Sequence, residues 1–333
     1  MLRMSPRHPL LSVALAALVA LAATACGTAT AGSTPKLTIG LTYVPNIQFA
    51  PFYVADSLGY YKDAGVSVTF HHHAAGEDEF AALTAGQENM IFASGDEVLQ
   101  ARSHSVPIVY LAEVFTQYPV ALIVPADSPI KTAADLKGHT IGVPGTYGAT
   151  YIGLLALLQS AGLTAKDVTI QSVGYTQVAA LLGHKVDAVM GYLNNEAIQF
   201  QKSNFPVRTL PVTSTQPLIS NGLAALQSEL DAHPSDVKAV IAATLKGVAY
   251  VDAHPDQALT ISKKYVPDLS DPANAADAMA VLQATIPLWQ PGSHPGAVDA
   301  SAWASMSSFL ASSGQLAGQI DASKALNTTY LPR

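Results

Sequence analysis

Residues 36–70 read KLTIGLTYVPNIQFAPFYVADSLGYYKDAGVSVTF, and their pattern indicates the fold class. Residues 36–41 alternate polar and apolar side chains, which is typical of a β-strand with one buried face. Residues 49–62 have the apolar spacing of a helix, and residues 66–70 predict the next strand. Strand, helix and strand in this order predict parallel strands joined by a crossover helix.

The same alternation continues along the chain and then stops. Strands are predicted over residues 90–93, 108–111, 120–124, 140–143, 168–173 and 188–190, and helices over 77–85, 96–102, 147–161 and 176–182. After residue 226 the pattern is nearly all helical, and Pro234, Pro255 and Pro272 stand where helices commonly begin. We therefore predict an α/β protein with two lobes on parallel sheets and a helical C-terminal wrapping.

The composition limits the class of protein. Charged residues make up 12% of the 333 residues, the formal net charge is −7, and no basic stripe with interleaved aromatic residues occurs. These features favour no nucleic-acid partner. Cys26 is the single cysteine, so the rest of the chain has no disulfide, thiol nucleophile or thiolate metal site. We expect a soluble, monomeric body of two lobes without a cofactor.

The N-terminus has the layout of a secretory signal peptide. Arg3 and Arg7 precede the uncharged run LLSVALAALVALAATA at residues 10–25, and Cys26 follows directly. The small residues before Cys26 resemble a bacterial lipobox, which predicts a signal peptide over 1–25, lipidation of Cys26 and a tether over 26–35. The alternatives are a plain cleaved signal and a membrane span, for which about sixteen apolar residues are few. We expect an exported lipoprotein anchored to the outer face of the cell membrane.

Candidate binding residues follow the predicted strands, because ligands of such sheets bind outside the carboxyl ends of the strands. In chain order they are Tyr43, Asn46, Gln48, His73, Glu77, Ser94, Asp96, Phe115, Tyr118, Gly145, Tyr147, Tyr192, Asn194, Asn195 and Glu196. Aromatic rings can stack on a flat ligand, while amides and carboxylates can bind its polar edge. Arginine and lysine are missing from these strand ends, so the set predicts a neutral ring rather than a sulfonate or a phosphate.

Five stretches in order resemble the solute-binding proteins of the NMT1/thiamine-pyrimidine group of ABC importers. They are residues 43–70, 92–124, 134–158, 191–200 and 218–225, and include PGTYGATYIGLLALL, GYLNNEAIQF and LISNGLAA. The resemblance implies a type II periplasmic-binding fold that closes on a small molecule and delivers it to a membrane permease. It implies lobe 1 over 36–121 and 218–333, lobe 2 over 122–217, and hinge crossings near 120–124 and 217–220. The implied ligand is the pyrimidine precursor of thiamine or riboflavin.

Two alternative functions stay open from the sequence. Fungal thiamine-pyrimidine synthases of the same fold use a histidine, iron and a cysteine-rich motif, and the absence of cysteine after Cys26 argues against such an enzyme. The triplet 71–73 is three histidines, of which His71 and His73 share one face of a strand. With Glu77 or Asp78 they would suit zinc or iron, and the alternative is one histidine facing the cleft.

The candidate binding residues also have structural interpretations. Tyr43 and Tyr192 suit core packing, and Asn46 suits a turn after proline. Residues 194–196 suit a helix cap, and the acids at 96 and 97 suit the first turn of a helix.

Overall fold

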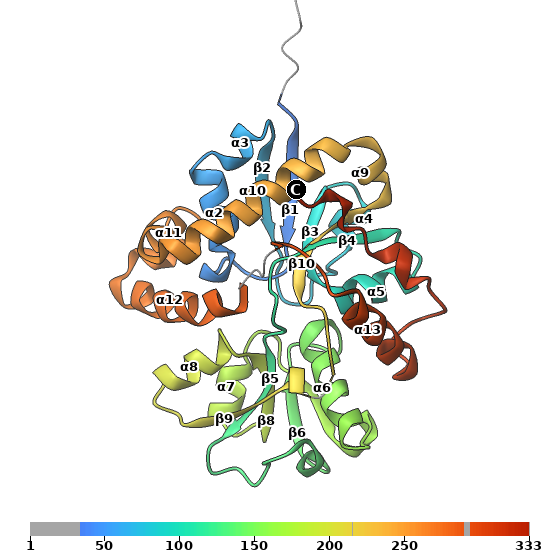
Figure 1. Ribbon diagram of the computed structural model, residues 1–333. Helices are drawn as coiled ribbons and strands as arrows, with labels where there is room; N and C mark the ends of the chain where they lie inside the picture. The colour runs from blue at the N-terminus through green and yellow to red at the C-terminus, as the bar shows by residue number, and fades with distance from the viewer. Residues whose placement is uncertain (1–33, 215, 290–293, 333) are drawn as a thin grey trace, which may run out of the picture. The chain divides into compact units, whose positions relative to one another are not determined.

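The computed structural model describes residues 34–332 except 215 and 290–293 (Figure 1). Residues Pro35–Arg333 form one compact unit. The expected signal peptide, the lipidation of Cys26 and the tether as far as residue 33 lie outside the described residues. Among the helices that are described, none combines the length and the hydropathy needed to cross a bilayer.

The first lobe is built on a five-stranded sheet in the order β2-β1-β3-β10-β4. Its strands are β1 (Lys36–Leu41), β2 (Ser67–His72), β3 (Met90–Ser94), β4 (Ile108–Glu113) and β10 (Asn221–Leu226). β1 pairs in parallel with β2 and β3, whereas β10 is antiparallel to β3 and β4. The prediction of a parallel sheet is therefore wrong for β10, because this strand comes from the returning chain and fills the place between β3 and β4.

The second lobe repeats this plan with the order β7-β6-β8-β5-β9. Its strands are β5 (Val120–Pro125), β6 (Thr140–Val143), β7 (Thr169–Ser172), β8 (Ala188–Tyr192) and β9 (Val207–Pro211). β6 is parallel to β7 and β8, and β5 is antiparallel to β8 and β9. This sheet is mixed too, with the entering strand β5 as the antiparallel one. Figure 1 shows the two sheets one above the other, with the two connections running between them.

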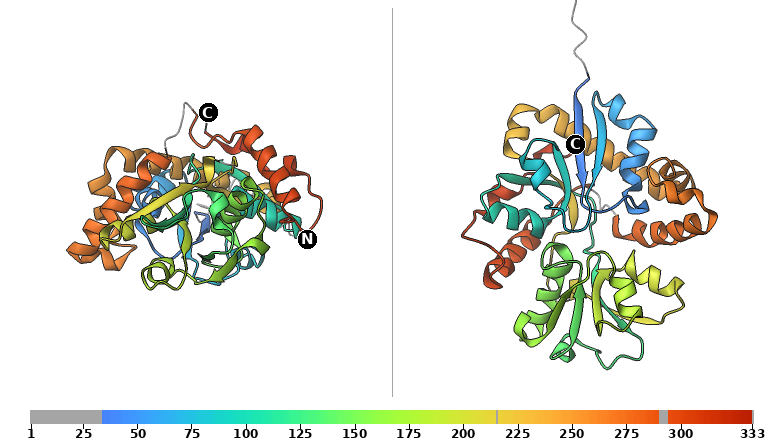
Figure 2. Two further views of the ribbon diagram at one scale, coloured as in Figure 1. Left: turned by 90° about the horizontal axis from the view of Figure 1, so that it is seen from below. Right: turned by 180° about the vertical axis from the view of Figure 1, so that it is seen from behind.

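Helices cover both faces of the first sheet, as the two views of Figure 2 show. The described helices are α2 (Ala50–Ser57), α3 (Tyr60–Asp63), α4 (Ala81–Thr84), α5 (Gly95–Ser103), α6 (Gly148–Ser160), α7 (Gln177–Leu182), α8 (Glu196–Lys202), α9 (Gln227–Ala232), α10 (Pro234–Ala253), α11 (Pro255–Ser262), α12 (Pro272–Thr285) and α13 (Ala300–Ser312). Short 3-10 helices lie at Ile47–Phe49, Ala133–Leu136, Ala165–Asp167, Val212–Ser214, Pro267–Ser270, Ile286–Trp289, Ala322–Ala325 and Thr328–Tyr330. Pro234, Pro255 and Pro272 each occupy the first turn, as predicted, because proline lacks the N–H that this turn leaves unbonded.

Two predicted helices are shorter in the structure. The helix expected over 49–62 is divided into α2 and α3 by Gly59, whose φ of 76° is a left-handed conformation that glycine adopts without strain. The helix expected over 77–85 is reduced to α4, so residues 74–80 form a loop between β2 and α4. This loop lies beside the cavity described below.

The chain passes between the sheets twice. It leaves β4 at Glu113 and enters β5 at Val120, so the first crossing precedes the hinge expected over 120–124, which is itself part of β5. The second crossing lies between β9 and β10 and includes the expected hinge at 217–220. The lobe boundaries and the hinge motion stay predictions.

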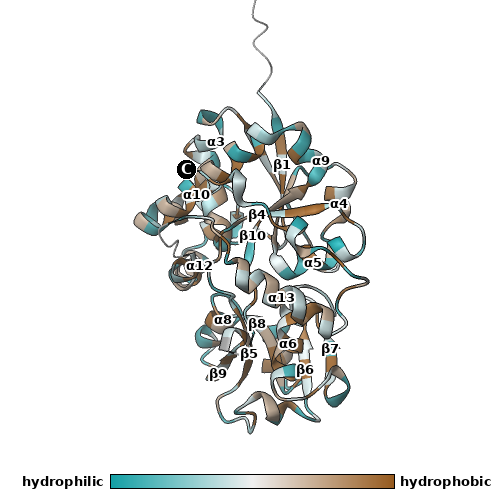
Figure 3. Cartoon of the chain, turned by 45° about the vertical axis from the view of Figure 1, so that its right-hand side comes forward, coloured by the Kyte–Doolittle hydropathy of each residue, from teal (hydrophilic) through white to brown (hydrophobic). Residues whose placement is uncertain are grey.

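The strands carry the apolar core. β3, β4 and β10 are buried along almost their whole length between the helices of the two faces. Figure 3 shows hydrophobic colours along the strands and more hydrophilic positions on outer helices such as α3 and α9. This burial fixes the positions of the strand ends, and the candidate site lies at those ends.

Candidate functional site

A cavity of about 80 Å³ lies between the strand ends of the two sheets. Both lobes contribute to its lining, which consists of Thr42, Tyr43, Gln48, Phe49, Glu79, Phe92, Glu97, Phe115, Pro144, Tyr147, Gly148, Ala149, Thr150, Tyr175, Gln177, Tyr192, Asn195, Glu196 and Asn221. A water occupies about 30 Å³ in the liquid, so the cavity has room for roughly two or three waters in this conformation. It is smaller than the roughly 150 Å³ of a cavity that holds a benzene ring.

Aromatic rings form much of the wall. Tyr43 of the first lobe contacts Tyr175 of the second, with ring centroids 4.6 Å apart and planes tilted by 59°. Behind them, the rings of Phe49 and Phe115 pack on Phe92 at centroid distances of 6.0 and 6.1 Å. Burial raises the pKa of the Tyr43 and Tyr175 hydroxyls, so both stay neutral donors at physiological pH. The wall therefore offers ring faces and hydroxyl groups to a ligand.

Three carboxylates line the cavity, and no lysine or arginine does so in the described part of the chain. Burial, followed by the charge of Glu97, raises the pKa of Glu79 well above its ordinary value. Burial also raises the pKa of Glu196. The raised pKa values favour protonated carboxyl groups, which donate as well as accept hydrogen bonds, and no lining side chain carries a positive charge that would compensate an anion.

Glu97 joins the two lobes across the cavity. It lies in the first turn of α5 and is 6% exposed. One carboxylate oxygen accepts a hydrogen bond from the Ser94 N–H at 2.7 Å, and the other accepts from the Ala149 N–H at 3.1 Å. Ala149 is in the first turn of α6, so Glu97 sits where the positive end of that helix favours a negative group.

Glu196 and Asn195 form the turn after β8. The two Glu196 oxygens accept from the Tyr192 N–H at 2.7 Å and from the Asn195 side-chain amide at 2.9 Å. Gly191 leaves room for this arrangement, because a Cβ there would lie 2.9 Å from Glu196 Cβ. Glu196 is therefore held in place by its own turn while it also lines the cavity.

Three other predicted residues lie behind the wall and not in it. The Asp96 carboxyl accepts from the hydroxyls of Ser94 and Tyr118, the latter at 2.9 Å. The Tyr118 hydroxyl is also 2.8 Å from the Ala149 carbonyl oxygen. Burial, followed by the charge of Glu97, raises the pKa of Asp96 to about 7. Ser94, Asp96 and Tyr118 thus form a buried link between the lobes.

Asn46, Gly145 and Asn194 have structural contacts. Asn46 caps a 3-10 turn, where its side-chain oxygen accepts from the Gln48 N–H at 3.1 Å. Gly145 makes room for the Tyr147 ring, which would lie 2.1 Å from a Cβ at this position. Asn194 is fully buried, and its amide donates to the Thr285 hydroxyl of α12 at 2.8 Å.

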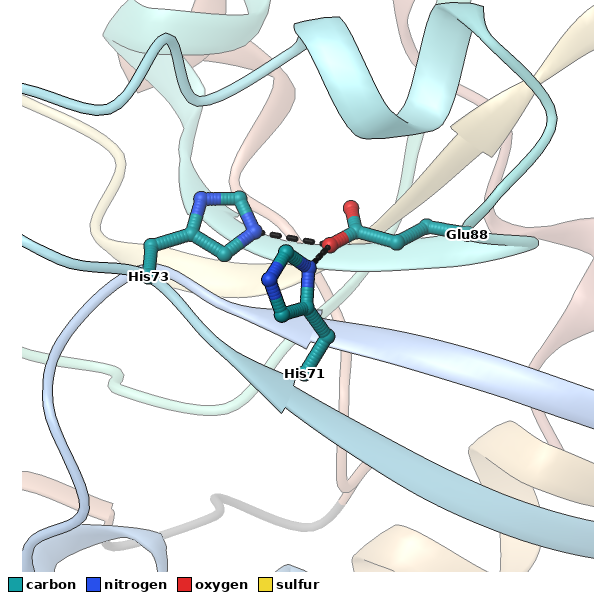
Figure 4. A group of neighbouring side chains, drawn as sticks. All are labelled: His71, His73 and Glu88. Carbon is teal, nitrogen blue, oxygen red and sulfur yellow. Dashed lines mark hydrogen bonds and ion pairs between the residues drawn. The ribbon is translucent and has the colours of Figure 1, made fainter.

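His73 and Glu77 lie at the end of β2 and in the loop after it, outside the cavity lining. The His73 ring contacts Glu88, as Figure 4 shows, and Glu77 accepts from the Ala74 N–H at 3.0 Å. The structure therefore gathers Tyr43, Gln48, Phe115, Tyr147, Tyr192, Asn195 and Glu196 at the cavity. It leaves Asn46, His73, Glu77, Ser94, Asp96, Tyr118, Gly145 and Asn194 outside the lining. Whether any of them binds ligand stays a prediction.

Several lining residues were absent from the predicted site. Tyr175 follows β7, so the strand-end rule applied to residues 168–173 would have found it. Asn221 begins β10, whose reversed direction brings its first residue to the edge where parallel strands end. Glu79 lies in the loop before α4, where the sequence predicts a helix. No strand end or motif near it indicates that it would line the cavity.

The comparisons with known proteins agree with the fold. The model of the NMT1/THI5-like family matches residues 46–258. The riboflavin-binding protein RibY of Chloroflexus aurantiacus is 31% identical over 303 residues, which cover 89% of this chain and 86% of that protein. A formylaminopyrimidine-binding protein of Halalkalibacterium halodurans is 26% identical over 66% of this chain and 68% of its own.

A solved structure is similar in fold as well. The alkanesulfonate-binding protein SsuA of Xanthomonas axonopodis pv. citri, bound to MOPS, has a TM-score of 0.71 at 18% identity, covering 88% of this chain and 98% of that chain. This likeness establishes the two-lobed periplasmic-binding fold. RibY and the formylaminopyrimidine-binding protein are named for binding, and so are several structural neighbours. Relatives of lower identity include proteins named 4-amino-5-hydroxymethyl-2-methylpyrimidine phosphate synthase.

Proposed function

Since the chain belongs to the NMT1/THI5-like family, we propose that it is the substrate-binding subunit of an ABC importer that captures a small heteroaromatic vitamin or vitamin precursor. One observation carries this proposal: a cavity between the two lobes is lined by aromatic rings from both and by carboxylates without a basic partner. Rings stack on ring faces, and carboxylates accept from ring amino or imide N–H groups. The protein performs no chemistry on its ligand.

The charges of the cavity define the ligand class. A sulfonate or phosphate would need arginine, lysine or a free helix N-terminus, and Glu97 already accepts from the first turn of α6. An anionic ligand would also meet Glu79 and Glu196. The ligand is therefore neutral or protonated, and it carries N–H donors at its edge.

Two ligands meet this description. Riboflavin is the first to test, because the relative that aligns over most of this chain carries that ligand in its name. An aminopyrimidine precursor of thiamine is the second, by the relative that binds formylaminopyrimidine. Both ligands need more space than the cavity of about 80 Å³ offers, because a cavity that holds benzene has roughly 150 Å³, and a three-ring flavin needs a more open arrangement of the lobes than a single pyrimidine ring does.

The binding mechanism is closure of lobe 1 (36–121 and 218–333) on lobe 2 (122–217). Tyr43 and Phe115 belong to the first lobe, and Tyr175 and Tyr192 to the second, so only the closed form contacts both faces of a ring. Ligand binding stabilises the closed form by this difference in contacts. The closed protein then docks on its permease as a monomer.

Export and anchoring complete the proposal. The signal peptide over 1–25 directs the chain out of the cell, and lipidation of Cys26 holds it at the outer face of the membrane. A tether over 26–35 leaves the two lobes free to reach the permease.

The experiment is to purify the protein without refolding, denature it, and analyse the released ligand by absorbance and mass spectrometry. A yellow, fluorescent extract identifies a flavin, and an aminopyrimidine mass identifies a thiamine precursor. The emptied and refolded protein is then titrated with riboflavin, with an aminopyrimidine and with the phosphorylated form of each. Binding of an unphosphorylated ring supports the proposal. Binding of neither ring, or preference for the phosphorylated forms, overturns it.

A further inference from the structure

Two histidines converge at the end of β2. His71 is in the strand and His73 directly follows it, so both side chains point to the same face while His72 points to the other. The ring centroids of His71 and His73 are 4.8 Å apart. His73 is 2% exposed, whereas the His71 side chain is 40% exposed.

Glu88, just before β3, completes the group. One Glu88 oxygen lies 2.6 Å from His71 Nδ1 and 2.7 Å from His73 Nε2 (Figure 4). The carboxyl fits because β1 has a glycine beneath it: a Cβ on Gly40 would lie 2.3 Å from Glu88 Oε2. Two rings and one buried carboxylate therefore present ligand atoms within 4.8 Å of one another.

The group is not satisfied by its own hydrogen bonds. Glu88 Oε2 and His73 Nδ1 are buried and have no partner among the described residues. An unpaired buried carboxylate oxygen is costly, because it has lost water and gained nothing in exchange. A divalent cation bound to the carboxylate and both rings would compensate the buried charge of Glu88, while His73 Nδ1, the ring nitrogen that does not contact Glu88, would keep no partner among the described residues.

We propose that His71, His73 and Glu88 form a binding site for a divalent transition metal, with zinc as the preferred ion. Zinc binds imidazole nitrogen and carboxylate oxygen at about 2.0–2.2 Å, which places tetrahedral ligand atoms roughly 3.4 Å apart. The present N···O distances of 2.6 and 2.7 Å must therefore lengthen by under about 1 Å, a shift that side-chain rotation supplies. The exposed side of His71 leaves the fourth position to water.

A second carboxylate supports the first histidine. Glu77 Oε1 lies 3.6 Å from His71 Nε2, the ring nitrogen that would not bind the metal. Histidines that bind zinc commonly donate this other N–H to a carboxylate, which orients the ring and increases its basicity. The present 3.6 Å is an ion-pair distance, and a shift of roughly half an ångström would bring Glu77 into hydrogen-bond range, where it would act as a positioning residue.

The donor set also defines what the site rejects. Magnesium and calcium prefer six or more oxygen ligands, and this site has two nitrogens and one carboxylate. The site is separate from the aromatic cavity, because none of its three residues lines that cavity. The loop after His73 does approach the second lobe: the Gly76 N–H donates to the Tyr147 hydroxyl at 3.2 Å. Zinc would fix the base of this loop.

The test uses purified protein without a histidine tag, stripped with a chelator and titrated with zinc alone against a chromophoric competitor. We expect one zinc per chain. His71→Ala, which changes a partly exposed side chain, and Glu88→Gln, which keeps the size of the buried one, should each lower zinc affinity at least tenfold. Glu77→Gln should lower it by about tenfold, as expected for the partner of a metal-binding histidine.

His139→Ala is the matched control, because His139 also pairs with a carboxylate, Asp187, at 3.1 Å but lies in the second lobe. It should bind zinc as the unchanged protein does. Circular dichroism establishes that each variant is folded. Cobalt provides a second readout, since its visible spectrum should report nitrogen and oxygen ligation that His71→Ala removes. Zinc affinity equal in the unchanged protein, His71→Ala and Glu88→Gln, or no zinc binding at all, would overturn the proposal.

Discussion

The Glu97 carboxylate of the first lobe accepts a hydrogen bond from the Ala149 N–H of the second lobe at 3.1 Å. This bond places the protein's own carboxylate at the N-terminus of α6, an end that commonly binds anionic ligands. The fold resembles that of an alkanesulfonate-binding protein, but this helix end already has a negative partner. The pair therefore links the lobes and disfavours an anionic ligand at the same point.

Removal of this carboxylate should relax the selectivity against anions. In Glu97→Ala, the first turn of α6 regains free N–H groups, so a phosphorylated ring should gain affinity relative to the unphosphorylated one by at least tenfold, or about 1.4 kcal/mol. Isothermal titration with both forms measures this ratio. Asp252→Ala, at an exposed acid of α10, is the control and should leave the ratio unchanged. An unchanged ratio in Glu97→Ala would show that Glu97 has no role in selectivity.

The ring of Tyr175 should contribute to binding by stacking. Tyr175→Ala removes the ring that contacts Tyr43 at 4.6 Å, and the affinity for the ring ligand should fall at least tenfold. Tyr175→Phe is the matched control, since it keeps the ring and removes only the hydroxyl, and its affinity should stay within about threefold. Fluorescence titration measures both. Equal losses in the two variants would assign the effect to the hydroxyl and not to stacking.

Stability should fall as pH rises toward neutrality, with Glu113 as one cause. Glu113 is 8% exposed, and burial raises its pKa to about 7 from about 4.3 in the unfolded chain. Between these values the folded state keeps a proton that the unfolded state has lost, so the free energy of unfolding decreases as pH rises. The full effect is roughly 4 kcal/mol and is reached above pH 7.

Glu113→Gln should remove this part of the pH dependence, because the amide stays neutral and its oxygen can still accept from the Ser220 N–H. Asp96, whose pKa is also raised to about 7, should maintain a residual slope of the same sign. Urea unfolding from pH 5 to pH 8 measures both proteins. A free energy of unfolding for the unchanged protein that is constant over this range contradicts the assignment.

Gly40 and Glu88 should be energetically coupled. Gly40→Ala places a methyl group 2.3 Å from the Glu88 carboxylate and should destabilise the protein by about 1–3 kcal/mol. Adding Glu88→Ala removes the clash, so the double variant should lose less than the sum of the two single variants. Thermal or urea unfolding of the four proteins completes the cycle. Strict additivity would mean that the two positions do not meet.

Cys26 should decide where the protein resides. In cells, Cys26→Ser should move the protein from the membrane fraction to the medium or the soluble exported fraction, because the lipid chain provides the anchor. Fractionation followed by detection of the two lobes measures this. A protein that stays with the membrane after the substitution would indicate an uncleaved span or another anchor.

Much of the fold was predictable because its signals are local. The alternation in residues 36–41 and the prolines at 234, 255 and 272 act within a few residues, and the structure confirms the elements they predict. β10 was not predicted as a strand, since its residues NGLAAL have little β-propensity and become a strand only between β3 and β4. The site residues divide in the same way. Tyr43 follows β1 and Tyr192 ends β8, and both strands have recognisable patterns, whereas Asn221 reaches the site only because β10 runs in the reverse direction.

Periodicity and composition are properties of neighbouring residues, so the amino-acid sequence was enough to predict most strands and helices, though not β9 or β10, together with the family and the aromatic, acidic character of the strand ends. Which of those residues meet is a property of the folded chain alone. The contacts of Glu97 with Ala149, of Tyr43 with Tyr175 and of Glu88 with the two histidines join segments far apart in the chain. Such contacts arise from sheet order and from the space that a residue such as Gly40 leaves, and neither has a local pattern.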